Sequence, residues 1–94
     1  DAAFLIYIPN AFSPNRDGKN DVFIPMLEGV KEYNLYIFDR FGGIIFETRD
    51  QSQGWDGKVN ENEFALVGDY AYAIRIIDFL GKKRNFTGSI TLIR

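Results

Sequence analysis

The chain has 94 residues with no cysteine or histidine, a formal net charge of −2, and 16% aromatic residues. The missing residue types exclude thiol catalysis, histidine-based general base catalysis, disulfides and the usual zinc sites. The mixed charges argue against a nucleic-acid binder, which needs a basic stripe, and no apolar run approaches the roughly 20 residues of a membrane-spanning helix.

The length predicts one domain, residues 1–94. The chain begins Asp1-Ala2-Ala3, without an initiator methionine or a signal peptide, so we expect it to be a fragment of a larger secreted protein. No segment has a sustained helical period, and there is no internal repeat, so the elements are predicted to be strands.

The first half of the chain predicts short strands around a polar loop. Phe4–Ile8 is an apolar run predicted to be a strand buried on both faces, and Val22–Ile24 is an extended segment that a following proline ends or places at a sheet edge. Tyr33–Asp39 is a predicted strand with Leu35 and Ile37 on one face, and Ile44–Thr48 returns after Gly42-Gly43. The paired glycines supply positive φ, which predicts a hairpin.

The second half predicts a turn and two long strands. Trp55-Asp56-Gly57 reads as a turn in which Trp55 closes the end of the core, although an exposed Trp55 stacking on a sugar or a partner is the alternative. Tyr70–Asp78 is the longest predicted strand, Leu80–Arg84 a basic hairpin tip, and Phe86–Arg94 a half-buried last strand. These elements predict an all-β fold, an immunoglobulin-like antiparallel β-sandwich of about seven strands.

The polar loop between the first two predicted strands is rich in oxygen ligands. Asn15, Asp17 and Asp21 alternate around Gly18, as calcium ligands do in an EF-hand loop. The first and last positions of that template hold residues that are poor ligands, so a complete EF-hand is excluded. Two interpretations stay open: a differently built calcium site with Asn15, Asp17 and Asp21 as ligands, or Asx-turns formed by Asn15, Asp17 and Asn20.

Asp17 and Asp21 can also be read as the paired carboxylates of a glycosidase. No other feature of the sequence predicts a cleft, and a domain of this size has little room for one. We therefore predict that the domain is not an enzyme and has neither catalytic residues nor a small-molecule substrate.

Several motifs occur along the chain in a recognisable order. They are Ile8-Pro9-Asn10-Ala11-Phe12-Ser13-Pro14-Asn15 with Asp17-Gly18 and Asn20-Asp21, Leu35-Tyr36-Ile37-Phe38-Asp39-Arg40-Phe41-Gly42 with Ile45-Phe46-Glu47, Trp55-Asp56-Gly57, Gly68-Asp69-Tyr70-Ala71-Tyr72, and Gly88-Ser89-Ile90-Thr91-Leu92-Ile93-Arg94. With this combination, from Tyr7 to Arg94, the chain resembles the gliding-motility-associated C-terminal domain, the type B sorting domain of the bacterial type IX secretion system. Each of the later motifs is weak alone, and the set is specific.

The sequence departs from the pattern of that family at four positions. Arg16 stands where the family usually has glycine, Phe41 replaces tryptophan, Asp39 replaces asparagine and Leu66 replaces proline. Arg16 bears on mechanism, because a position that needs positive φ tolerates arginine poorly and any ion site there would be altered.

The resemblance implies a sorting signal that directs a surface or secreted protein of Bacteroidota through the type IX secretion system. It also implies transit through the periplasm, recognition by the translocon and by an outer-membrane partner of the PorP/SprF kind, and final secretion or display on the cell surface. We expect the isolated domain to be a monomer. The competing interpretation is an immunoglobulin-like binding or adhesion module, stabilised by calcium, which an exposed aromatic platform would favour.

We expect recognition through pairing of a partner strand with the edge of Phe86–Arg94, assisted by the loop at 13–21. The candidate recognition residues are Asn10, Asp17, Asn20, Lys82, Lys83, Arg84, Ile90, Leu92 and Arg94.

Overall fold

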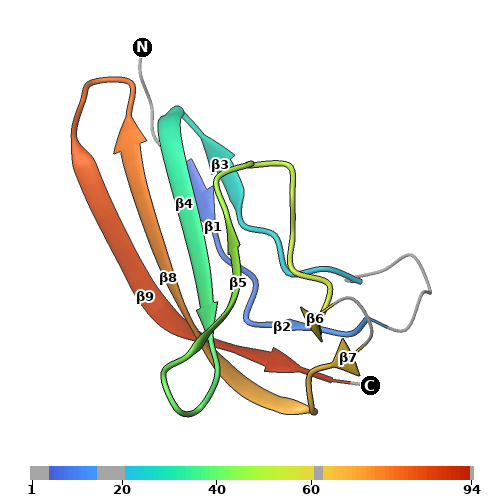
Figure 1. Ribbon diagram of the computed structural model, residues 1–94. Coiled ribbons are helices and arrows are strands. Elements are labelled where there is room, and N and C mark those ends of the chain that lie inside the picture. The colour runs from blue at the N-terminus through green and yellow to red at the C-terminus, as the bar shows by residue number, and fades with distance from the viewer. Residues whose placement is uncertain (1–4, 15–20, 61–62, 94) are drawn as a thin grey trace.

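The computed structural model describes residues 5–14, 21–60 and 63–93, and every regular element in these ranges is a β-strand (Figure 1). The strands are β1 (Leu5–Tyr7), β2 (Ala11–Phe12), β3 (Met26–Glu28), β4 (Val30–Phe38), β5 (Ile44–Thr48), β6 (Lys58–Asn60), β7 (Glu63–Phe64), β8 (Gly68–Asp78) and β9 (Lys83–Leu92). The described ranges contain no helix of the length and apolarity that crossing a membrane requires. The all-β prediction is confirmed.

The larger layer is a five-stranded sheet in the order β2-β9-β8-β4-β5. The pairs β4–β5, β4–β8 and β8–β9 are antiparallel, as expected of strands that belong to two hairpins. Strand β2 instead pairs with β9 in parallel, with Ala11 opposite Thr91 and Phe12 opposite Leu92. This parallel pair differs from the predicted antiparallel sandwich, because β2 reaches the sheet from the other layer and no hairpin sets its direction.

The smaller layer consists of short pairs of strands. β1 pairs with β3, β6 pairs with β7, and a single antiparallel bridge joins Phe23 to Trp55. Figure 1 shows these elements lying over one face of the long, twisted strands β4, β8 and β9. The buried core of this sandwich-like arrangement comprises Phe12, Phe23, Val30, Tyr33, Leu35, Ile37, Trp55, Ala65, Ile74, Ile76, Ile90 and Leu92.

The alternation of the long strands sets which face is buried. In β8 the side chains of Ile74 and Ile76 are buried while Arg75 is exposed, and in β9 Ile90 is buried while Thr87 is exposed. Successive side chains point to opposite faces of a strand, so one face of the sheet makes the core and the other stays polar. The prediction of a half-buried last strand is confirmed.

The first predicted strand is less buried than expected. The prediction for Phe4–Ile8 was burial on both faces, but Leu5 and Tyr7 in β1 have 58% and 64% of their surface exposed. Only one face of the β1–β3 pair packs toward the core, so the other face carries apolar side chains outward. Val22–Ile24 is not a strand either, because only the bridge at Phe23 pairs it with another segment.

Candidate functional site

Aromatic residues from several of the motifs pack together in the core. The ring of Phe12 lies 5.3 Å from that of Trp55 and 6.4 Å from that of Phe23, centroid to centroid. Trp55 also makes an edge contact with Tyr70 at 5.2 Å. Such tilted aromatic contacts add to the area that the side chains bury. These motif residues therefore hold the fold together.

Trp55 is fully buried and its polar group is satisfied. Its Nε1 donates to the carbonyl of Lys58 at 2.9 Å, which closes the turn after Trp55. Gly57 has φ of 87°, and a Cβ there would lie 3.2 Å from Leu92 Cδ1, so the turn requires glycine. The prediction that Trp55 closes the core is confirmed, and Trp55 offers no exposed platform for a sugar.

The two ends of the motif set are joined by backbone hydrogen bonds. The N–H of Thr91 donates to the carbonyl of Asn10 at 3.0 Å, and the N–H of Ile93 donates to that of Phe12 at 2.9 Å. The Thr91 hydroxyl donates to Asp69 Oδ1 at 2.6 Å. The end of β9 is therefore held between β2 and β8.

The outer edge of β9 is covered only at its end. Within the described residues β2 pairs with this edge at Thr91 and Leu92, and no strand pairs with it from Lys83 to Ile90. Thr91 points its N–H away from β8, so by alternation the backbone groups of Lys83, Asn85, Thr87 and Ser89 also point outward. This stretch, residues 83–89, is an open strand edge to which another strand can add.

The far end of the same strand is a rigid turn around Asp78. Asp78 Oδ1 accepts the N–H groups of Leu80 and Lys82, both at 2.9 Å, and Oδ2 accepts Arg84 Nε at 3.3 Å. The carboxylate is 3% exposed. The hydrogen bond from Lys82 N–H, with those from Arg84 and Leu80, outweighs burial and lowers the pKa of Asp78 below its ordinary value.

The candidate recognition residues fall at two separate places. Lys82 and Lys83 are exposed, and Arg84 is half-buried, at the Asp78 turn. Asn10 lies at the opposite end, beside Thr91. Ile90 and Leu92 are fully buried, so their side chains are held in the core. Asp17, Asn20 and Arg94 lie outside the described residues.

The calcium hypothesis falls largely outside the described residues. Asn15 and Asp17 are not described, and of the three proposed ligands only Asp21 is, with its side chain half-buried. In the described ranges, no group of three or more Asp, Glu, His or Cys side chains is placed to hold a metal ion.

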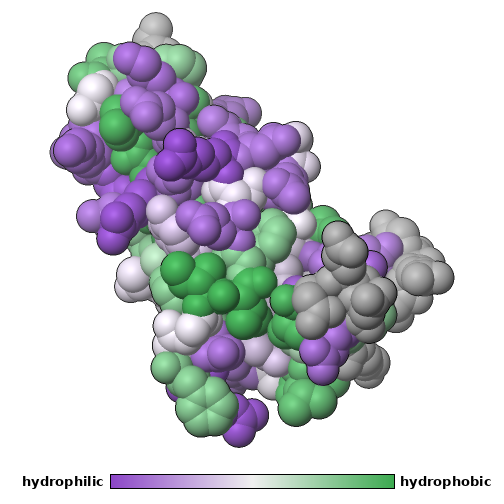
Figure 2. Space-filling model, viewed as in Figure 1, coloured by the Kyte–Doolittle hydropathy of each residue, from purple (hydrophilic) through white to green (hydrophobic). Residues whose placement is uncertain are grey.

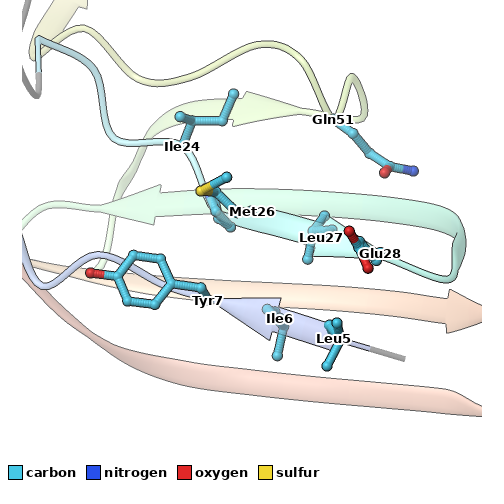
Figure 3. A pocket seen from close by; sticks show the side chains of 9 residues that line it. Leu5, Ile6, Tyr7, Ile24, Met26, Leu27, Glu28 and Gln51 are labelled. Carbon is cyan, nitrogen blue, oxygen red and sulfur yellow. The ribbon is translucent and has the colours of Figure 1, made fainter. Parts of the chain in front are cut away.

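A shallow apolar cavity of about 730 Å³ lies beside β1 and β3 (Figure 3). Tyr7, Met26 and Ile24 line it, with Glu28 and Gln51 at its margin. Glu28 is the one carboxylate among its described lining residues.

One buried tyrosine stands apart from both places. Burial raises the pKa of Tyr33, and its hydroxyl has no hydrogen-bond partner among the described residues. The side chain is 3% exposed and packs in the core, so we regard it as a core residue.

Sequence reasoning predicted a hairpin tip at Leu80–Arg84 but missed the role of Asp78 in closing that turn. The signal was present, because Asp78-Phe79-Leu80-Gly81 repeats the pattern of Asp39-Arg40-Phe41-Gly42. In each turn the aspartate accepts backbone N–H groups two and four residues later.

Fold and surface together define a small β-sandwich module whose exposed features are a strand edge and hairpin ends. A family model described as the CHU_C Type IX secretion signal domain matches residues 6–92. The chain therefore belongs to the family of type IX secretion signal domains, which confirms the resemblance seen in the sequence. No protein in a search of the curated proteins matches it.

Membership of this family gives the domain its role. It is a C-terminal sorting signal that directs a protein through the type IX secretion system, and it acts by interaction with that system. The protein that carries it is exported to the cell surface or secreted. The family is one of secretion signals and not of enzymes.

Proposed function

We propose that this domain is the type B sorting signal of a larger Bacteroidota protein. Within the type IX signals, it would be of the gliding-motility-associated kind. It folds as a monomer in the periplasm and is recognised there by an outer-membrane partner of the PorP/SprF kind. The family match over residues 6–92 supports this proposal, since it covers nearly the whole chain.

The open edge of β9 is the proposed recognition element. Four residues, Lys83, Asn85, Thr87 and Ser89, turn their backbone donors and acceptors outward along it. A partner strand that adds there gains main-chain hydrogen bonds without disturbing the bonds between β8 and β9. The covered end at Thr91 and Leu92 fixes where the added strand must stop.

Fusion of residues 1–94 to a periplasmic reporter tests the sorting role. In a bacterium with a type IX system, we expect the reporter on the cell surface or in the medium. The reporter alone, without residues 1–94, is the control and should remain in the periplasm. Retention of the complete fusion in the periplasm would contradict the proposal.

Thr87→Pro in the same fusion tests the edge. Thr87 N–H points away from β8, so proline removes an outward donor and leaves the pairing with Ala73 intact. We expect the thermal midpoint to change little and export to fall several-fold, because one hydrogen bond and close approach are lost. Thr87→Val keeps the N–H and is the matched control. Equal export of the two variants would rule out pairing at this edge.

Calcium is a separate proposal, with Asn15, Asp17 and Asp21 as the ligands. Its support is the alternation of these oxygen-bearing residues around Gly18. If the ion binds the folded domain, millimolar calcium should raise the thermal midpoint relative to a chelator, and Asp21→Asn should reduce the shift. Millimolar magnesium is the control. An unchanged midpoint in calcium would retire the hypothesis.

A further inference from the structure

The two hairpins of the large sheet are closed by the same kind of turn. Asp39 Oδ1 accepts the N–H groups of Phe41 and Gly43, both at 2.9 Å, and Asp78 Oδ1 accepts those of Leu80 and Lys82. The glycines that follow, Gly42 and Gly81, have φ of 87° and 84°. Backbone bonds and the aspartate thus hold each turn in one conformation.

Each of these rigid turns holds an apolar side chain out in solvent. Phe41 is 89% exposed in the turn between β4 and β5, and Leu80 is 78% exposed in the turn between β8 and β9. Figure 1 shows the two turns at opposite ends of the sheet, as the pairing of Phe38 with Ala71 requires. Apolar groups held away from the core at both ends are available for contact with other molecules.

The turn between β8 and β9 also exposes a second apolar side chain and two lysines. Phe79 is 64% exposed next to Leu80, and the exposed side chains of Lys82 and Lys83 follow. No described acidic residue pairs with either lysine. Phe79 N–H donates to Gly29 O at 3.3 Å, which ties this turn to the end of β3. We call the residues 79–83 the hairpin end.

We propose that the hairpin end inserts into the secretion partner, at an apolar socket bordered by carboxylates. This proposal rests on the proposed function, because it names the surface of the sorting domain that the secretion partner recognises. Phe79 and Leu80 fill the socket, and Lys82 and Lys83 face its acidic rim. Two such side chains in a desolvated pocket with a charged rim are typical of an interface anchor.

The charges around the hairpin end favour a protein over a lipid surface. The exposed Glu28 precedes Gly29, and the exposed Glu32 lies opposite Ile77, which in turn pairs with Lys83. Figure 2 shows polar and apolar side chains intermixed at this end of the molecule. A uniformly anionic membrane would repel the two glutamates while attracting the lysines. A protein socket can place its carboxylates opposite the lysines alone.

Leu80→Asp and the double variant Lys82→Glu/Lys83→Glu test the insertion in the reporter fusion. Leu80→Asp removes the leucine that the proposal buries in the partner's socket. Burial of one such side chain is worth enough free energy that export should fall about tenfold or more. The charge-reversed variant should lose export to a similar extent and show a steeper dependence on partner level. Thermal midpoints of the purified 94-residue variants should remain near that of the unchanged chain, because all three side chains are exposed.

Phe41→Asp is the matched control, since it changes a similarly exposed apolar residue in the equivalent turn and should leave export unchanged. Undiminished export of Leu80→Asp would overturn the insertion, and so would an equal loss with Phe41→Asp. Binding of the purified chain to phosphatidylglycerol vesicles that depends on Lys82 and Lys83 would overturn it in favour of a lipid surface. Retention of the unchanged fusion would overturn the sorting role itself, so the two failures are distinguishable.

Discussion

At the scale of single residues, Asp78 is the side chain that fixes the turn between β8 and β9. Its carboxylate joins three backbone or side-chain donors while it is almost fully buried. A carboxylate in this position is stabilised in its charged form, because hydrogen bonds to the anion lower the pKa. The ionised form of Asp78 therefore contributes to the stability of the folded domain.

Asp78→Asn should make the thermal midpoint of the domain less dependent on pH. The folded-state pKa of Asp78 lies below the unfolded one, so its contribution is present above about pH 4 and is lost as the pH falls through the folded-state value. At neutral pH, we expect the variant to have a thermal midpoint several degrees lower, since the ion pair with Arg84 is lost. Below about pH 4 the two midpoints should converge.

A pH series of thermal unfolding curves for both proteins measures this. Asp39→Asn is the control, because an amide oxygen can still accept both backbone bonds and the described residues provide Asp39 with no salt bridge. Its midpoint at neutral pH should change little. A gap between Asp78→Asn and the unchanged chain that widens in acid would show that the carboxylate is not held ionised by the fold.

At the scale of elements, the sequence predicted the long strands well and the short ones poorly. Tyr70–Asp78 and Ile44–Thr48 were found nearly as predicted, because alternation and paired glycines specify them locally. β2 has only two residues, and its partner β9 lies about 80 positions later, so no local pattern indicates the pairing. The exposed face of β1 was missed for the same reason, since burial there depends on a second layer.

The candidate site divides in the same way. The basic cluster Lys82–Arg84 was predicted from composition, and the structure places these three residues together at one turn. Ile90 and Leu92 were named for recognition because of their place in the last strand, and both side chains are in the core. Only the register between β8 and β9 shows which backbone groups of that strand point outward.

At the scale of the whole molecule, the first and last thirds of the chain depend on each other. β2 rests on the end of β9, and Phe12 and Leu92 enter the core together with Trp55. A sorting signal with this connectivity is complete only when its final strand is in place. We therefore expect export to require the folded domain.

Leu92→Ala tests whether export requires the folded domain. Leu92 has 0% of its surface exposed, so the variant should lose about 2–5 kcal/mol of unfolding free energy. For a domain of this size, each kcal/mol lowers the thermal midpoint by about 4–8 °C. Ile93→Ala, which changes an adjacent side chain that is 47% exposed, should have a much smaller effect.

Export of the two variants in the reporter fusion, measured below and above the midpoint of Leu92→Ala, separates the two kinds of recognition. If the folded surface is read, Leu92→Ala is exported at the lower temperature and retained at the higher one, while Ile93→Ala is exported at both. Retention of both variants at both temperatures would instead indicate that the side chains of the last residues are read directly. Because Leu92 is fully buried in the folded domain, direct reading of its side chain would require the end of β9 to leave the core.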